Sequence, residues 1–159
     1  MKNNEYDDAD VLGALAASGV RALIIGRKAL IILGLPVMTN DYDLWIHIDD
    51  IERLNDAFAE LDHFPSKAPD AARQTGRYVL ENGERIDVLV ARFASTKDGT
   101  TRLDFDAAWS RRQLVEVTAG VAVALPSISD LIITKKWSAR QKDIGDIQLL
   151  ETLIREEAK

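Results

Sequence analysis

Hydrophobic residues recur along the first third of the chain at spacings that alternate between those of a helix and those of a strand. Helical spacing predicts an amphipathic helix over 7–18 and a second long helix over 49–61, which opens on a capping-box pattern. Between them, the short apolar run 20–25 predicts a buried strand, and residues 27–33 predict a short helix. Strict alternation over 41–48 predicts a further strand, whose even-numbered residues pack into the core.

The rest of the chain carries two hairpin signals before it ends in helices. The dipeptide Asn82-Gly83 lies between two strand-like runs over 77–90 and is the strongest hairpin signal in the sequence. A second pair of strands, predicted over 114–125, extends or borders the sheet. A helical tail follows at about 127–159, and its first helix begins at a serine cap. Two polar segments without clear periodicity are expected to be loops, namely 62–75 and 95–112.

Length and composition indicate one globular unit. A chain of 159 residues with 47% hydrophobic content can bury one substantial core, so we expect a single domain over 1–159. The net charge of −6 argues against strong general attraction to nucleic-acid backbones. The first ten residues are polar, and no apolar run reaches about 18 residues. We therefore expect a cytoplasmic protein with no membrane partner.

Metal chemistry in this chain must use oxygen ligands. The sequence has no cysteine, which excludes disulfides and thiol catalysis, and its two histidines make a zinc site of His and Cys implausible. Asp41 and Asp43 are two residues apart on a predicted strand, so they share a face with Cα atoms roughly 6.6 Å apart. Asp87 interrupts an apolar strand, where a carboxylate is costly unless it is paired or bound to metal. Each acid, taken alone, is also consistent with an ordinary solvated surface position.

A glycine at 26 joins the predicted strand 20–25 to the short helix that follows. Such a turn directs backbone N–H groups and the positive end of a helix dipole outward, where they can bind an anion. Arg27 and Lys28 add positive charge at the same turn. Taken alone, such a turn is more often an ordinary connection between a strand and a helix.

The order of these features resembles the signature of nucleotidyltransferases of the DNA polymerase beta superfamily. That signature places an apolar residue and two small residues before a strand with the pattern acid, apolar, acid, and here it reads Ile25-Gly26-Arg27 followed by Asp41-Tyr42-Asp43-Leu44. Thr39 before the acids is similar to small bacterial members, including antitoxin-like and abortive-infection proteins. Their helical tail is matched by Lys135, Arg140, Lys142, Asp143 and Asp146. The second small residue of the signature is replaced by Arg27.

The resemblance implies an α+β fold with a mixed β-sheet flanked by helices and with C-terminal helices. It also implies metal-dependent transfer of a nucleoside monophosphate from a nucleoside triphosphate to a hydroxyl of a protein, an RNA or a small molecule. Asp41, Asp43 and Asp87 would be catalytic and would bind Mg²⁺ or Mn²⁺. The nucleotide would be bound by Gly26, Arg27, Lys28, Thr39 and Lys135.

Two other readings of the same residues remain open at this stage. The chain could be a catalytically weak or inactive nucleotide-binding module, for example the antitoxin-like half of a two-component system with a toxin or antitoxin partner. Arg27 in the signature favours that reading. A purely structural α+β domain requires Gly26, Asp41, Asp43 and Asp87 to occur in this order by coincidence.

Overall fold

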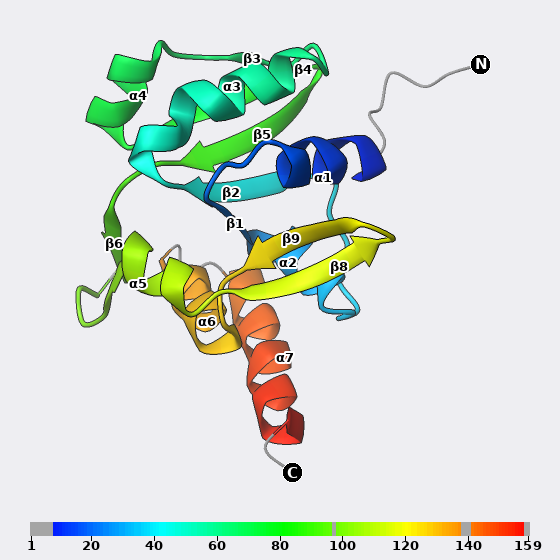
Figure 1. Ribbon diagram of the computed structural model, residues 1–159. Coiled ribbons are helices and arrows are strands. Elements are labelled where there is room, and N and C mark those ends of the chain that lie inside the picture. Colours follow the sequence, from blue (N-terminus) through cyan, green and yellow to red (C-terminus); the bar gives the residue numbers. More distant parts are fainter. Residues whose placement is uncertain (1–7, 97, 138–140, 158–159) are drawn as a thin grey trace.

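A mixed β-sheet with five strands lies at the centre of the protein (Figure 1). The computed structural model describes residues 8–96, 98–137 and 141–157. The strand order is β1-β2-β5-β4-β3; β2 and β5 run parallel, and the other neighbours are antiparallel. The bounds are β1 Ala22–Ile25, β2 Tyr42–Ile46, β3 Phe64–Pro65, β4 Arg77–Asn82 and β5 Glu84–Leu89. The hairpin predicted at Asn82-Gly83 is confirmed as the β4–β5 connection, where Gly83 has a φ of +74°.

Seven α-helices are described around the sheet, so the predicted α+β fold is confirmed. Their bounds are α1 Asp8–Ala17, α2 Gly26–Ile32, α3 Ile51–Ala59, α4 Pro69–Thr75, α5 Phe105–Ser110, α6 Ile128–Lys136 and α7 Gln141–Glu157. Ser127 caps α6 as predicted, because its Oγ accepts a hydrogen bond of 3.2 Å from the backbone N–H of Asp130. Among the described residues, none of the helices is long and apolar enough to cross a membrane.

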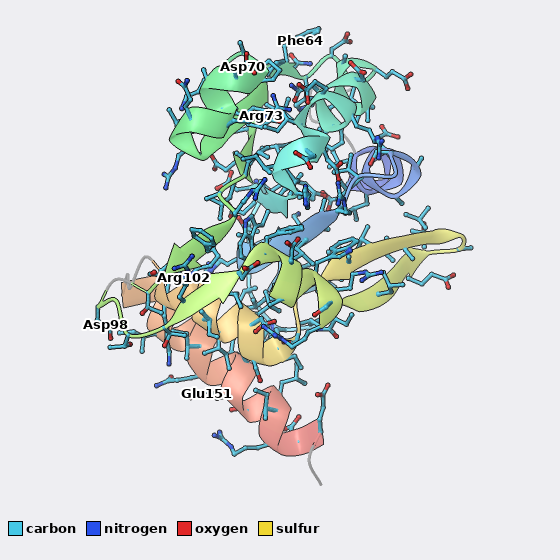
Figure 2. All side chains as sticks on the ribbon, turned by 60° about the vertical axis from the view of Figure 1, so that its left-hand side comes forward. Phe64, Asp70, Arg73, Asp98, Arg102 and Glu151 are labelled. Carbon is cyan, nitrogen blue, oxygen red and sulfur yellow. The ribbon has the colours of Figure 1, made fainter. Side chains whose placement is uncertain are left out.

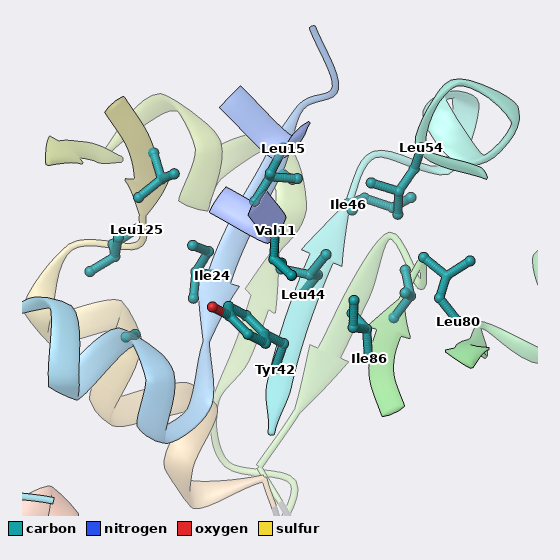
Figure 3. Packing of buried hydrophobic residues seen from close by; sticks show 14 of the residues in the cluster. Val11, Leu15, Ile24, Tyr42, Leu44, Ile46, Leu54, Leu80, Ile86 and Leu125 are labelled. Atoms are coloured by element: carbon teal, nitrogen blue, oxygen red, sulfur yellow. The ribbon is translucent and has the colours of Figure 1, made fainter. Parts of the chain in front are cut away.

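The larger hydrophobic core covers one face of the sheet. Tyr42, Leu44 and Ile46 of β2 point into it together, as the alternation of the strand predicts (Figure 3). Apolar side chains of α1 and α3 close this core from outside, with Val11 and Leu54 among the contributors. This packing positions β2, and it leaves Asp43 on the opposite face.

The opposite face of β2 is buried as well, which corrects the expectation that only its even-numbered residues enter the core. Trp45 is fully buried and packs beside Leu23 in a second, smaller cluster. Its ring makes edge contacts with Phe105 of α5 and with Trp137, which follows α6, at centroid distances of 5.3 and 5.1 Å. Pattern alone could not reveal this burial, because the covering residues lie about 60 or more positions away in the sequence.

Two segments differ from their predicted structure, and the second hairpin agrees with one of the two placements predicted for it. The expected loop 62–75 contains β3 and α4, and α4 begins with Pro69 at its first turn and ends at Gly76 in the left-handed conformation. The expected loop 95–112 contains α5 and β7 (Arg102–Asp104), which pairs with β6 (Phe93–Ser95). The second hairpin forms as predicted, as β8 (Gln113–Thr118) and β9 (Val121–Leu125); it is a separate sheet of two strands that lies against β1 and borders the central sheet without extending it.

The predicted capping box at Asp49 is also wrong. A 3₁₀ turn over Ile48–Asp50 precedes α3, and its cap is the His47 side chain, which accepts a hydrogen bond from the backbone N–H of Asp49. The neighbouring Asp50 is buried and accepts hydrogen bonds of 2.9 Å from two of the three side-chain nitrogens of Arg21, Nε and Nη2. Burial alone would raise the pKa of Asp50, but the hydrogen bonds from Arg21 outweigh it and lower the pKa. The start of α3 is therefore fixed by a contact with Arg21, directly before β1, and not by a local cap.

Candidate active site

A cleft of about 490 Å³ lies on the face of the sheet that carries Asp43 and Asp87. Its floor is formed by β2, β5 and β4, and one wall is formed by Thr134 and Lys135 at the end of α6 with Trp137 beyond it. A volume of this size lies within the range of pockets that bind small molecules, about 300–1,000 Å³. The cleft can therefore hold a molecule of nucleotide size.

Asp43 and Asp87 lie side by side at the middle of the cleft. The register of the parallel strands β2 and β5 pairs these two residues directly, and both line the cleft. Adjacent strands are about 4.8 Å apart, so the two carboxylates share one small region. Asp87 is half exposed and accepts a hydrogen bond of 3.3 Å from Arg85. The structure thus joins two of the three predicted catalytic acids.

Asp41, the third predicted acid, does not line the cleft. It is exposed and precedes β2, and its backbone N–H donates to Thr39 Oγ1 at 3.1 Å. Thr39 therefore makes a local turn contact, which the sequence also allows. Within the described part of the chain, no three acidic, histidine or cysteine side chains converge as a ready metal-binding group. Asp43 and Asp87 supply carboxylate oxygens, the donor type that Mg²⁺ and Mn²⁺ prefer, so the cleft fits such an ion at these two residues.

Gly26 fits tightly against Asp43. It has a φ of +69°, and a Cβ atom placed on it would lie 2.5 Å from Asp43 Oδ2 and 3.3 Å from Asp43 Cβ. Both the backbone conformation and the close approach therefore require glycine at this position. The resemblance in the sequence named Gly26 for its place in a turn, and the tertiary structure adds a direct steric role beside a candidate catalytic acid.

Replacing Gly26 with alanine is expected to destabilise the fold and to displace Asp43. The unfavourable φ costs about 1–2 kcal/mol, and the contact with Asp43 adds to it. Gly34→Ala is the matched control, because Gly34 has a φ of +86° and no heavy atom within 4 Å of its added Cβ. Urea unfolding of both variants measures the difference; equal losses of stability would contradict a tight contact between residues 26 and 43.

Arg27 and Lys28 are engaged away from the cleft. Arg27 donates hydrogen bonds from Nε and Nη2 to the Asp146 carboxylate, at 3.1 and 3.3 Å. Its Nη1 donates to the backbone carbonyl of Met38. The Lys28 ammonium is buried, lies 3.4 Å from Asp8, and stands over the ring of Tyr42 at 4.5 Å. Since Tyr42 and Asp43 point to opposite faces of β2, Lys28 lies on the face opposite the candidate acids. Neither residue lines the cleft.

Lys135 does line the cleft, and it is held by two buried carboxylates. Its Nζ lies 2.7 Å from Asp146 and 3.5 Å from Asp143, and all three side chains are nearly inaccessible to solvent. Asp143 and Asp146 belong to the tail pattern that resembles the family, and the structure buries both carboxylates beside Lys135. Of the other tail residues, Arg140 and the Lys142 side chain lie outside the described residues.

Several cleft residues were not singled out from the sequence. Ser66, Lys67, Arg77 and Arg85 line its other end, beyond Asp87, and Trp137 forms part of its wall. One signal was available, because the alternation of β4 and β5 places Arg77 and Arg85 on the same face as Asp87. We call Gly26, Thr134, Lys135 and Asp143 the Gly26 side of the cleft. We call Ser66, Lys67, Arg77 and Val79 the Lys67 side.

Comparison with solved structures identifies the class of fold. The antibiotic-resistance factor ANT(2'')-Ia is similar with a TM-score of 0.64 at 20% identity, over 91% of this chain and 80% of that one. The lincosamide antibiotic adenylyltransferase LnuA, solved with lincomycin, has a TM-score of 0.62 at 10% identity, over 92% and 98% of the two chains. TM1012 of Thermotoga maritima, assigned as a nucleotidyltransferase, has a TM-score of 0.55 at 19% identity, over 93% and 88%. No protein-family model and no curated protein matches the chain.

These likenesses establish the fold, since each covers more than nine tenths of this chain and two of the similar structures are described as an adenylyltransferase and a nucleotidyltransferase. The chain therefore has the nucleotidyltransferase fold. The resemblance to antitoxin-like and abortive-infection members in particular stays a prediction.

Proposed function

We propose that this protein transfers a nucleoside monophosphate from a nucleoside triphosphate to a hydroxyl group of an acceptor. The observation that carries the proposal is the direct pairing of Asp43 with Asp87 in a cleft beside Gly26, within a nucleotidyltransferase fold. The chemistry of the reaction needs closely spaced carboxylates next to a place for phosphate. The similar structures LnuA, described as an adenylyltransferase, and TM1012, described as a nucleotidyltransferase, support the class of reaction, while the antibiotic acceptor belongs to LnuA.

The triphosphate would bind on the Gly26 side of the cleft. Lys135 is the cation that lines this side of the cleft. On binding, it would replace part of its ion pairing with Asp143 and Asp146 by contacts with phosphate oxygens. Arg27 and Lys28 would act indirectly in this scheme. Arg27 would fix α2 to α7 through Asp146, and Lys28 would support β2 through Tyr42.

The transfer itself is a single exchange of bonds at the α-phosphorus. The acceptor oxygen forms a bond to that phosphorus, the bond to the oxygen bridging the α- and β-phosphates breaks, and pyrophosphate leaves with the electron pair. The proton of the acceptor hydroxyl passes to the Asp87 carboxylate, which faces the side of the cleft away from Gly26. Mg²⁺ or Mn²⁺ held by Asp43 and Asp87 would neutralise charge on the phosphates.

Removal of divalent metal is expected to stop the reaction. Native protein with α-labelled nucleoside triphosphates, Mg²⁺ or Mn²⁺, and cell extract as the source of acceptor should give labelled product and pyrophosphate. Excess chelator should abolish both, and added metal should restore them, because the clustered carboxylates leave the phosphate charge uncompensated without a cation. Transfer that persists in chelator would contradict a metal-dependent mechanism.

A second candidate function rests on the position of Asp41. Because this acid is exposed and lies outside the cleft, the protein could bind a nucleotide without turning it over, as expected for an antitoxin-like module. The same experiment distinguishes the two functions. Saturable binding of nucleotide without pyrophosphate release in any extract would support the binding module and would argue against the enzyme.

A further inference from the structure

The cleft extends across most of the sheet, with the two candidate acids at its middle. Gly26 follows β1, Asp43 and Asp87 lie on the central strands β2 and β5, and Ser66 and Lys67 follow β3 at the far edge. With strands about 4.8 Å apart, the distance from β5 to β3 is about 10 Å. A nucleotide bound on the Gly26 side therefore leaves room beyond Asp87 for a small second molecule.

On the Lys67 side of the cleft, the Lys67 ammonium is held in place by hydrogen bonds to α4 and β4. The Lys67 ammonium donates to Thr75 Oγ1 at 2.9 Å and to the backbone carbonyl of Arg77 at 3.2 Å, which uses two of its three hydrogens. Both the backbone and the side chain of Ser66 are hydrogen-bonded to β4. Its N–H donates to the Val79 carbonyl, and its Oγ accepts from the Val79 N–H. The loop that carries Lys67 is thus fixed against the floor of the cleft.

The positive charge of Lys67 and Arg77 is not balanced within the described residues. The ion pairs of this region join Arg73 to Glu52 and Asp70, and Arg85 to Asp87. Over residues 8–96, 98–137 and 141–157, no carboxylate lies within ion-pair distance of Lys67 or Arg77. The Gly26 side differs, because its Lys135 is matched by Asp143 and Asp146. The two ends of the cleft therefore have different electrostatic character.

We propose that the Lys67 side binds the phosphate group of a small acceptor alcohol, with Lys67 and Arg77 as its ligands and the reacting hydroxyl directed towards Asp87. This inference rests on the proposed transfer reaction and adds the class of acceptor. A phosphate matches an ammonium and a guanidinium that line the same side of one cleft, because each forms charge-assisted hydrogen bonds with its oxygens. The limited volume of the cleft favours a small phosphate ester over a polymer, and the exposed cations disfavour a cationic antibiotic as acceptor.

Binding can be tested without any turnover. In ¹H–¹⁵N spectra of the full chain, glycerol 3-phosphate should shift the amide signals of Lys67, Arg77 and Val79, while glycerol should not. The shifts should weaken as salt is raised, because exposed charges are screened. Shifts confined to Gly26 and Lys135, or equal shifts with glycerol, would overturn the proposed phosphate site. Because no nucleotide is present, this result is independent of whether the protein is a nucleotidyltransferase.

Transfer then tests the acceptor class. Glycerol 3-phosphate and ribose 5-phosphate should accept label from α-labelled nucleoside triphosphates at least about tenfold better than glycerol and ribose, the gain expected from charge-assisted hydrogen bonds. Preference for lincomycin, or for an RNA oligonucleotide with a free 3′ hydroxyl, would overturn the acceptor class while leaving the transferase function standing. If phosphate bound at Lys67 and Arg77 but no acceptor received label, the phosphate site would stand and the proposed transferase function would be contradicted.

Arg77→Glu is the variant that targets the site itself. It should lower the preference for phosphorylated over plain acceptors by about tenfold and abolish the glycerol 3-phosphate shifts. Arg155→Glu is the matched control with the same change of charge on an exposed arginine of α7, at the end of the molecule opposite α4 (Figures 1 and 2). Equal effects of the two variants would mean that the preference for phosphorylated acceptors depends only on the net charge of the protein, and would overturn the proposal. Thermal unfolding of Arg77→Glu establishes that the fold is retained, and Arg77→Gln gives a second, uncharged variant in which the same loss is expected.

Discussion

Asp43→Asn is expected to reduce nucleotidyl transfer by roughly a thousandfold, which corresponds to about 4 kcal/mol at the transition state. Asparagine preserves the size of the side chain and therefore its packing against Gly26, but it removes the negative charge. The carboxylate is the part of Asp43 that a divalent cation requires, so the substitution should affect catalysis more than folding. Label transfer from α-labelled nucleoside triphosphates measures the loss.

The matched control for that variant is Asp56→Asn. Asp56 is an exposed residue of α3, and α3 covers the face of the sheet opposite Asp43. This control should retain native activity, and both variants should have unfolding midpoints close to that of the native protein. If Asp43→Asn kept most of the activity, the paired carboxylates of β2 and β5 would not be the catalytic centre, and the proposed function would lose its main support.

Asp146→Asn is expected to destabilise the protein by about 3 kcal/mol or more. Asp146 is buried and binds Lys135 at 2.7 Å and Arg27 at 3.1 Å, so its loss leaves two cations without their main partner. Removing one member of a buried ion pair typically costs about 3–5 kcal/mol, because the remaining charge stays desolvated. Urea unfolding with comparable m-values would measure the change directly.

Glu151→Gln on the same helix is the control for Asp146→Asn, since Glu151 is exposed (Figure 2). A surface change of this kind should alter the free energy of unfolding by no more than about 0.5 kcal/mol. If the two variants lost similar stability, the link from α2 through Asp146 to α6 would not contribute to the fold. The position of Lys135 at the cleft would then need another explanation.

The stabilising effect of Asp146 should depend on pH in a defined direction. Burial by itself would raise the pKa of this carboxyl, but hydrogen bonds from Lys135 and Arg27 outweigh burial and lower the pKa below its usual value. A carboxyl with a lowered pKa stabilises the folded state fully above its unfolded pKa of about 4, and the contribution is lost as the pH falls through the folded value. The difference in stability between native protein and Asp146→Asn should therefore be constant at neutral pH and shrink below about pH 4. A difference that instead grew on acidification would contradict this sign.

Local signals in the sequence were sufficient for most of the regular elements. Periodicity located α1 and β2, and the dipeptide Asn82-Gly83 located the β4–β5 hairpin, because each pattern follows from geometry within a few residues. The short helices α4 and α5 were missed. Each has at most seven residues, and helices of that length depend on tertiary packing more than on propensity. Ala72 of α4 and Phe105 of α5 are buried by neighbours distant in the chain.

For the candidate site too, some features could be predicted from the sequence and others required the tertiary structure. Resemblance to a family signature singled out Gly26, Asp43 and Asp87, and the structure brings these three together. The roles expected for Arg27, Lys28 and Thr39 concerned the directions of side chains, which short-range spacing does not determine. Thr39 makes a local turn contact, Arg27 binds Asp146, and Lys28 binds Asp8. The assignment of these three residues to nucleotide binding stays a prediction.

By itself the sequence determined the positions of α1, β2 and the β4–β5 hairpin, the absence of thiol chemistry, and the shared strand face of Asp41 and Asp43. These properties depend on composition and on spacing along one element, which the chain carries locally. Only the tertiary structure decided the register that pairs Asp43 with Asp87, the burial of Trp45 on the second face, and the separation of the cleft into a neutralised and a cationic end. Each of these depends on contacts between residues far apart in sequence, and the packing of the whole core selects among the many pairings that local patterns allow.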